Sequence, residues 1–546
     1  MRHHLIQAAV TTILVTASAC GGSDAAEQPP TGTGGGGDAP PCGSVASEPG
    51  LVNTEQGPVR GKLDGDVWGY QGIPYAAPPV AELRFRPPTA PACHDGILEA
   101  NAFGPMCPQV GRDDEGAVIA RGDEDCLTLN IWAPENADQR QVLLFIHGGG
   151  NVQGSANWEP FPGLSLYHGK DLAEATGAVV VTINYRLGVL GYLKDAALAA
   201  ESEHGVSGNY GILDQIQALT WVRDNIAGFG GDPERVTIFG QSGGAVDVCV
   251  LLASPLAAGL FHGAIMQSGA CVSEADSSID AVSQDAIAAL GCEGAPDVAA
   301  CLRDVPAEDV ILSFPLDPET AGSRPDMQAH VDGWVLEATP LETIANEQHH
   351  AVPTIVGVNG DETGLGAPQM DQASFEATVL QLAKGSQALA SAILDAYPVA
   401  DYGGSYRDAW IALSSDMQFV CPSREAASTL AAHQQEPVYR YHFTRGFTSP
   451  QLASAGAFHG IELFFIFDKL GWGSHKAPEE ETALASDVGA YWSAFAGGNL
   501  GDVGPVAWPT YDQKTHDYLV LDVPVQAASG GIRTAQCDFW ASLGGL

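Results

Sequence analysis

Basic residues are scarce in this sequence. Its 546 residues include 24 Lys and Arg against 66 Asp and Glu, which gives a formal net charge of −42 at pH 7. That balance repels phosphate backbones and anionic lipid headgroups, so it gives no support to a nucleic-acid or membrane-surface protein. Because 45% of the residues are hydrophobic, extensive disorder is also excluded, and the composition predicts a globular protein.

Beyond the N-terminus no apolar run approaches the ~20 residues that a spanning helix needs. Residues 1–19 combine a basic start with an apolar stretch and the small residues Ala17-Ser18-Ala19, the pattern of a secretory signal peptide. Cys20 follows directly and resembles the lipid-carrying Cys of a bacterial lipoprotein; cleavage that releases a soluble protein is the alternative. Residues 20–50 are rich in Gly and Pro and predict a flexible tether, so 51–546 is the expected catalytic domain of an exported protein.

Cysteine pairs with zinc-ligand spacing are absent, so we expect no metal site. Eleven Cys in an exported chain suggest disulfides, and an even number remains when Cys20 is set aside. Spacing alone does not fix the connectivity. Local sequence favours the pairs Cys107 with Cys126, Cys292 with Cys301, Cys421 with Cys537, Cys42 with Cys93 and Cys249 with Cys271.

Short β-branched runs alternate with longer helical patterns along the chain. One helical pattern covers Leu213–Ile226, where apolar residues recur near a 3.6-residue period. Such alternation predicts one α/β domain with a large, mostly parallel central sheet and helices on both faces. The expected strands are Val142–Ile146, Val179–Ile183, Val236–Phe239, Ala264–Gln267, Thr354–Val358 and Val438–Phe443.

The strongest local motif is Gly240-Gln241-Ser242-Gly243-Gly244, placed between a strand pattern and a helix pattern. A tight turn between strand and helix needs small neighbours and exposes the serine hydroxyl, so this is the context of a nucleophile elbow. A second motif, His147-Gly148-Gly149-Gly150, follows the strand Val142–Ile146. Its N–H groups could donate to an oxyanion together with that of Gly243, whereas the spacing of a phosphate-binding loop is missing. We expect His147 to anchor this loop.

A general base and an acid are expected downstream, because α/β-hydrolase triads run in the order Ser, acid, His. His459, flanked by glycines after the strand Val438–Phe443, is the candidate base. Asp361 and Glu362 follow the strand Thr354–Val358, and spacing does not choose between them, since one could cap the next helix.

These residues resemble the type-B carboxylesterases, a family that includes cholinesterases, lipases and bacterial para-nitrobenzyl esterases. The similarity runs from about Gly57 to Trp540. It rests on G-I-P-Y-A-A-P-P from Gly72, L-R-F-R-P-P from Leu83, E-D-C-L-T-L-N-I-W-A-P from Glu124, N-Y-R-L-G from Asn184 and F-G-G-D-P-E-R-V-T-I-F-G-Q-S-G-G from Phe229.

The resemblance implies an α/β-hydrolase fold and a site that needs no cofactor. By motif it places the nucleophile on Ser242, the acid on Glu362 and the base on His459. It also implies the oxyanion donors Gly149, Gly150 and Gly243, the disulfides Cys107–Cys126, Cys292–Cys301 and Cys421–Cys537, and the ion pairs Arg186–Asp214 and Arg84–Glu124.

Three departures from the family pattern bear on the substrate. Gln241 stands where Glu is common, which removes a negative charge beside the site, and Asn151 stands where Phe is usual. The stretch Pro108–Asp125 contains no aromatic residue that could hold a quaternary ammonium by cation–π attraction. Choline esters are therefore disfavoured.

The sequence thus predicts an exported serine carboxylesterase that acts on small-molecule esters, with short to medium acyl chains favoured. A lipase for longer acyl chains is the alternative. A non-catalytic binding protein on the same scaffold is remote, because such proteins typically lose a triad member and all three are present. We expect a monomer that binds no nucleic acid and reaches a membrane only through a lipid on Cys20.

Overall fold

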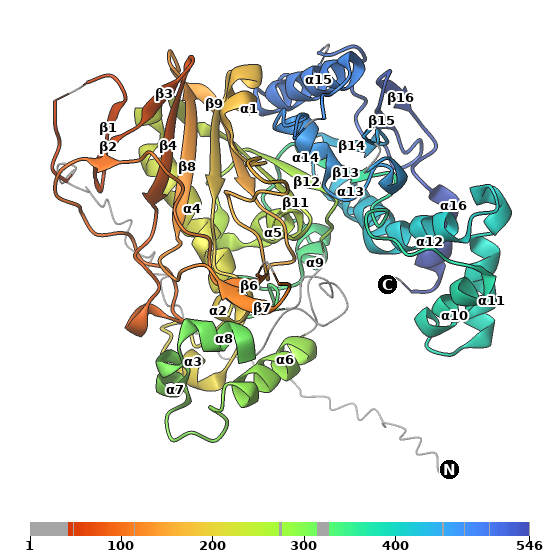
Figure 1. Cartoon of the computed structure of the whole chain (residues 1–546), viewed down its shortest axis with the longest axis horizontal. Helices are drawn as coiled ribbons and strands as arrows, with labels where there is room; N and C mark the ends of the chain where they lie inside the picture. Colours follow the sequence, from red (N-terminus) through yellow and green to blue (C-terminus); the bar gives the residue numbers. More distant parts are fainter. Residues whose placement is uncertain are drawn as a thin grey trace, which may run out of the picture. The chain divides into compact units, whose positions relative to one another are not determined.

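The computed structural model describes residues 42–46, 48–113, 115–271, 276–313, 327–449, 452–473, 475–501 and 503–544. The expected signal peptide, Cys20 and most of the expected tether therefore lie outside the described residues. Residues 41–546 form one compact unit (Figure 1). Its strands are β1 Leu51–Thr54, β2 Gly57–Arg60, β3 Lys62–Asp64, β4 Val67–Pro74, β5 Leu98–Glu99, β6 Gln109–Arg112, β7 Val118–Arg121, β8 Thr128–Pro134, β9 Arg140–Ile146, β10 Val179–Ile183, β11 Gly231–Gln241, β12 Gly263–Gln267, β13 Thr354–Asn359, β14 Val438–Phe443, β15 Tyr518–Leu521 and β16 Gln526–Ala528.

The helices lie around an eleven-stranded sheet whose order is β16-β15-β14-β13-β12-β11-β9-β10-β8-β4-β3. They are α1 Lys170–Thr176, α2 Gly188–Tyr192, α3 Ala196–Ala200, α4 Tyr210–Asn225, α5 Gly243–Ala253, α6 Asp276–Ala289, α7 Val298–Asp304, α8 Ala307–Ser313, α9 Pro340–Ala345, α10 Gln372–Leu382, α11 Gln387–Ala396, α12 Tyr406–Ser415, α13 Cys421–His433, α14 Ile461–Ile466, α15 Glu479–Ala496 and α16 Thr534–Ser542.

The centre of the sheet is parallel, as the sequence predicts. β9 pairs in parallel with β10 and β11, and the parallel order continues through β12, β13 and β14 to β15. The six strands expected from the sequence are all present, and the expected helix Leu213–Ile226 is α4. These strands are buried on both faces, which is why they read as almost continuous apolar runs.

Both edges of the sheet are antiparallel, which the sequence analysis did not anticipate. β8 pairs with β10, β4 with β8, β3 with β4 and β16 with β15 in antiparallel register. β3 is fully exposed and short, so hydrophobic periodicity gives no signal for it.

Two apolar cores cover the two faces of the sheet. Alternate residues of β9 divide between them: Leu144 and Ile146 pack with residues of α4, α5 and α13, whereas Leu143 and Phe145 pack with residues of α1, α14 and α15. A third cluster joins α10, α11, α12 and α16 beside the end of β13. These helices lie at the right of Figure 1. The arrangement leaves the carboxyl ends of β9, β11, β12 and β13 free to carry loops, where α/β sheets place their sites.

Five disulfides join the ten described Cys in the pairs expected from the sequence. They are Cys42–Cys93, Cys107–Cys126, Cys249–Cys271, Cys292–Cys301 and Cys421–Cys537, with Cα–Cα distances of 5.0–5.7 Å. The first one, together with a hydrogen bond from the Cys42 N–H to the carbonyl of Glu55 (3.2 Å), attaches Cys42 to the body. No described helix is long and apolar enough to cross a membrane.

Candidate active site

Ser242 occupies a sharp turn between β11 and α5. Its backbone has φ 57° and ψ −124°, a strained conformation for a residue with a side chain. The turn is closed by glycines, because a Cβ on Gly240 would lie 2.2 Å from the carbonyl oxygen of Gly244. A Cβ on Gly244 would lie 2.2 Å from the carbonyl oxygen of Ile146. The G-x-S-x-G spacing is therefore a steric requirement of the turn, which leaves Ser242 partly exposed at the carboxyl end of β11.

The imidazole of His459 is held by Glu362. Its Nδ1–H donates to Oε2 of Glu362 at 2.7 Å, and its backbone N–H donates to the carbonyl of Glu362 at 3.0 Å. The other carboxylate oxygen of Glu362 accepts from the backbone N–H of Asn359 at 2.7 Å, and Glu362 is only 2% exposed. With the proton on Nδ1, Nε2 carries the lone pair that a general base needs.

Asp361 has a different position, although it is adjacent in sequence. Its Oδ2 accepts from the backbone N–H of Ala457 at 3.0 Å, and its own N–H donates to the carbonyl of Ala457. Asp361 therefore joins the loop after β13 to the loop that carries His459. Spacing along the chain did not choose between Asp361 and Glu362; in the structure Glu362 is the one that bonds to the imidazole.

Gln241 contacts the imidazole from the other side, which the sequence analysis missed. Its amide Nε2 lies 3.0 Å from Nε2 of His459, so the amide donates to the lone pair of the neutral ring. Among the described residues, this contact, and not one from the Ser242 hydroxyl, is the hydrogen bond at Nε2. Catalytic hydrogen bonds are often long in ligand-free enzymes. An ionised Glu at position 241 has no proton to donate in this way. The presence of Gln241 where the family commonly has Glu was therefore the sequence feature that could have predicted this contact.

A second buried acidic side chain, that of Glu462, lies close to Glu362. Its oxygens accept from the amides of Asn359 (2.5 Å) and Gln267 (3.2 Å). Burial, together with the charge of Glu362, raises the pKa of Glu462 to about 7. For His459, burial lowers the pKa, but the hydrogen bond and charge of Glu362 and the charge of Glu462 outweigh it, so the pKa of His459 is raised above its ordinary value.

We expect kcat/KM for a neutral ester to fall on the acid side with a midpoint above pH 6.5. Only the neutral imidazole accepts a proton, and the net raised pKa of His459 means that the ring protonates earlier as the pH falls. The measurement is kcat/KM for p-nitrophenyl butyrate across the acid and neutral range. A profile that stays flat down to pH 5 would contradict this role of His459.

The loop His147-Gly148-Gly149-Gly150 after β9 lies against the Ser242 turn. A Cβ on Gly148 would lie 3.0 Å from Cβ of Ser242, and a Cβ on Gly243 would lie 2.8 Å from the backbone N of Gly150. Gly149 and Gly150 have φ values of 111° and 60°, a region that favours glycine. The glycine loop therefore packs against the elbow, with the backbone N of Gly150 close to Gly243, and these are two of the residues expected to supply oxyanion donors.

His147 is buried at the base of this loop. Its ring stacks on Tyr185 with centroids 4.4 Å apart, and its Nδ1 lies 2.9 Å from the carbonyl oxygen of Gly148. Burial lowers the pKa of His147 to about 4, so the ring is neutral. These contacts suit an anchoring residue, the role expected from the sequence.

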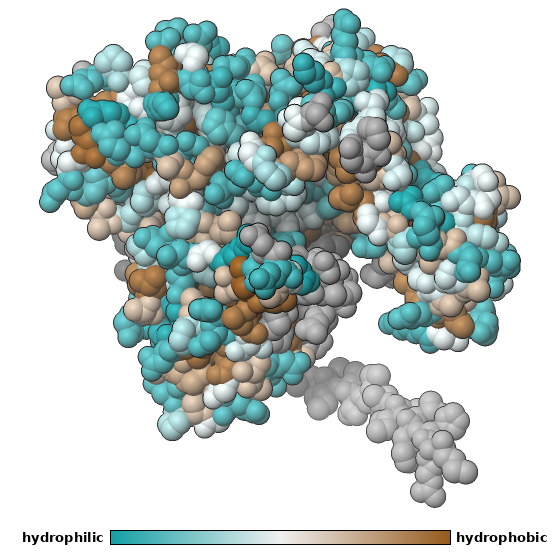
Figure 2. Space-filling view, in the orientation of Figure 1, coloured by the Kyte–Doolittle hydropathy of each residue, from teal (hydrophilic) through white to brown (hydrophobic). Residues whose placement is uncertain are grey.

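The Cys107–Cys126 loop forms the β6–β7 hairpin, which is joined to the glycine loop. The side-chain amide of Gln109 donates to the carbonyl of Gly154 (2.9 Å) and accepts from its N–H (2.8 Å). Val118 at the hairpin is 44% exposed, and Figure 2 shows hydrophobic residues gathered there within a mostly hydrophilic face. The ring of Phe419 packs on the imidazole of His459, with ring centroids 4.6 Å apart.

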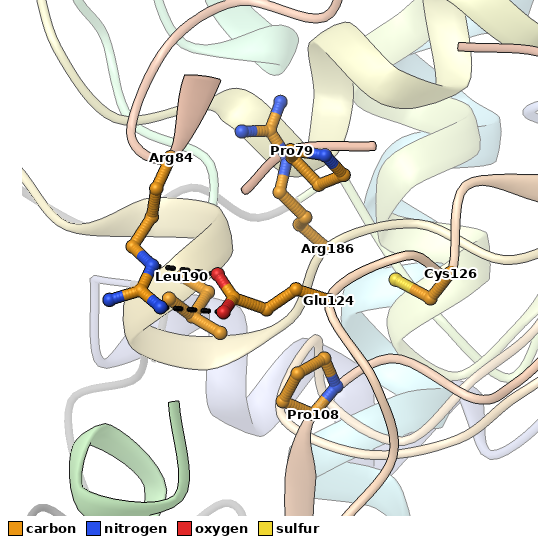
Figure 3. Close-up of a pocket in the computed structure, with 7 residues that line it drawn as sticks. All are labelled: Pro79, Arg84, Pro108, Glu124, Cys126, Arg186 and Leu190. Carbon is orange, nitrogen blue, oxygen red and sulfur yellow. Dashed lines mark hydrogen bonds and ion pairs between the residues drawn. The ribbon is translucent and has the colours of Figure 1, made fainter. Parts of the chain in front are cut away.

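The two ion pairs that the family resemblance implies are both present, and one of them includes Glu124 of the disulfide loop. Arg84 binds Glu124 through Nε and Nη2, at 2.7 and 2.5 Å (Figure 3). Arg186 binds Asp214 in the same bidentate way at 2.8 and 2.7 Å, with both side chains almost fully buried. Paired geometry of this kind is what makes buried charges tolerable.

Comparisons with known proteins agree with this geometry. Residues 48–540 match the model of the carboxylesterase family. The chain is 35% identical to a fumonisin B1 esterase of Sphingopyxis macrogoltabida over 87% of each chain. It is 34% identical to the para-nitrobenzyl esterase of Bacillus subtilis, over 86% of this chain and 94% of that protein. A solved structure of a PNB esterase superposes with a TM-score of 0.75 at 31% identity, over 88% of this chain and 98% of that chain.

Proposed function

This chain belongs to the carboxylesterase family, and from that premise we propose that it cleaves esters of short to medium acyl chains through an acyl-enzyme on Ser242. As a member of that family it is a carboxylic ester hydrolase with the α/β-hydrolase fold. The identity of the catalytic residues and the acyl preference are the proposed part.

In the proposed reaction His459 takes the hydroxyl proton of Ser242 as the oxygen attacks the ester carbonyl. The N–H groups of Gly149, Gly150 and Gly243 donate to the oxyanion of the tetrahedral intermediate. His459 then returns the proton to the leaving alcohol, and water releases the acid by the same two steps. Glu362 fixes the tautomer of His459 and stabilises its imidazolium.

One observation carries this assignment: the 2.7 Å hydrogen bond from Nδ1 of His459 to the buried carboxylate of Glu362. It leaves Nε2 as the proton acceptor on the side of the ring where Gln241, the residue before Ser242, makes contact. An orienting acid, a base and an elbow serine in this relation are the parts of an acyl-transfer site.

Acyl preference is tested by hydrolysis of p-nitrophenyl acetate, butyrate and palmitate. We expect kcat/KM to be highest for acetate or butyrate and at least ~10-fold lower for palmitate. A maximum at palmitate would indicate a lipase instead. Equal, negligible rates for all three esters would contradict the proposed activity on these substrates.

Export to the cell envelope or the medium is the second proposed part. Five disulfides support an oxidising compartment, since cytosolic proteins rarely keep them. The signal-like residues 1–19 and the lipoprotein-like Cys20 suggest how the chain would be exported and, if lipid is attached, held at a membrane.

A further inference from the structure

The glycine loop ends in a turn that contains a strained asparagine. Gly150 and Asn151 have φ values of 60° and 57°, and the N–H of Val152 donates to the carbonyl of Gly149 at 3.1 Å. Positive φ at both central residues is the signature of a type I′ turn. Glycine adopts positive φ freely, whereas Asn151 does so at a cost in conformational energy. We therefore expect the Asn151 side chain to make hydrogen bonds that offset this cost.

Both ends of the Asn151 side chain are held. Its Nδ2 donates to Oδ1 of Asp247 in α5 at 2.8 Å. Its Oδ1 lies 3.1 Å from the hydroxyl oxygen of Tyr185, whose single proton is shared between Asn151 and the carbonyl of His147, 2.7 Å away. Asn151 is 1% exposed. The two ends of the glycine loop, His147 and Asn151, are therefore fastened to one buried polar cluster.

Asp247 is an unusual residue for its position. It is completely buried, and none of the ion pairs found among the described residues gives it a basic partner. Its second oxygen accepts from Nε2 of Gln215 at 2.6 Å, so two side-chain amides are its hydrogen-bond donors. Burial raises the pKa of Asp247 to about 7, and these two bonds offset part of the increase. An apolar residue at this position of α5 would avoid the free-energy cost of burying a carboxylate. The presence of Asp247 therefore indicates a specific function for its side chain.

We propose that Asp247 is a positioning residue of the oxyanion hole, which holds the N–H groups of the glycine loop against Gly243 through its hydrogen bond to Asn151. The proposal rests on the proposed function of the Ser242 site. Because a carboxylate only accepts hydrogen bonds, it fixes which way the Asn151 amide faces. The backbone N of Gly150 lies next to Gly243 and directly precedes Asn151, so a shift of Asn151 displaces an oxyanion donor.

The test is Asp247→Ala. We expect kcat for p-nitrophenyl butyrate to fall about 10²-fold while KM changes less than about threefold, because oxyanion donors act mainly in the transition state. The affinity of an alkyl trifluoromethyl ketone, whose serine adduct places an oxyanion in the hole, should weaken by the same factor as kcat/KM. A purely structural residue would lower Tm without moving either quantity in the folded enzyme.

Two variants complete the design. Asp247→Asn should restore most of the activity, because its Oδ1 can accept from Asn151 while its Nδ2 donates to Oε1 of Gln215, which has no partner among the described residues. Gln215→Met is the matched control: it removes a hydrogen bond from the same carboxylate but leaves the one to Asn151, so we expect it to lower Tm while kcat falls much less than in Asp247→Ala.

The outcomes separate the two proposals. If Asp247→Ala fails to fold, Asn151→Ala removes the same hydrogen bond from the loop side and should show the same fall in kcat and in ketone affinity. Wild-type rates and ketone affinity in both folded variants would overturn the positioning role while the esterase stands. A wild-type protein that neither hydrolyses the ester nor binds the ketone would overturn the proposed function and this inference together.

Discussion

Replacement of Ser242 by Ala should lower kcat for p-nitrophenyl butyrate by about 10⁴-fold or more, since loss of a catalytic serine in comparable triads has effects up to ~10⁶. The oxygen that attacks the carbonyl is lost, while the oxyanion donors and His459 stay in place. The turn should persist, because Ala has the same Cβ as Ser and the steric limits lie at Gly240 and Gly244. The measurement is steady-state kinetics of both proteins, with circular dichroism and Tm to show that the variant is folded.

Ser254 provides the matched control for this substitution. It lies directly after the same helix α5, is completely buried, and its hydroxyl has no hydrogen-bond partner among the described residues. Ser254→Ala should therefore keep kcat within about twofold, as is usual for substitutions away from a site's chemistry. If Ser242→Ala kept more than about a hundredth of the wild-type rate, Ser242 would not be the nucleophile.

Replacement of Glu362 by Gln should lower kcat by about 10⁴-fold, the size of effect seen when an orienting carboxylate is made neutral. The carboxylate accepts from His459 with one oxygen and from the N–H of Asn359 with the other. An amide has one acceptor oxygen, so its NH₂ group must face one of these two donors, and the imidazole loses its tautomer or its position.

The pH profile gives a second readout for Glu362→Gln. The hydrogen bond and charge of Glu362 raise the pKa of His459. Their loss lowers that pKa, so the acid limb of the residual activity should move to lower pH. An unchanged acid limb with a reduced rate would contradict direct contact between Glu362 and the base.

Asp361→Asn is the control that the chain itself offers. Among the described residues the carboxylate of Asp361 accepts one hydrogen bond, from the N–H of Ala457, and Oδ1 of Asn can accept it equally well. We expect kcat to change less than about tenfold, because the residue does not touch His459. If instead Asp361→Asn lost activity and Glu362→Gln kept it, the acid would be Asp361.

Local features of this molecule could be predicted from the sequence because they depend on residues that are close together along the chain. The elbow follows from the glycines on both sides of Ser242, whose substitution would bring a Cβ onto backbone atoms of the same turn or of β9. The central strands follow from continuous burial of β10, β12 and β13 on both faces. The edge strand β3, which has no buried face, gave no comparable signal.

The sequence by itself determined the fold class, the nucleophile candidate and the family resemblance, since each depends on residues that are close along the chain. The resemblance also placed the acid on Glu362, but only the tertiary structure shows its contact with His459 and the bond from Gln241 to Nε2. The tertiary structure alone also brought Asp247 beneath the glycine loop. The partners in these three contacts are 97, 218 and 96 residues apart. No local periodicity encodes such distances, because they are set by strand order and by the way the loops at the carboxyl ends of β9, β11 and β13 converge.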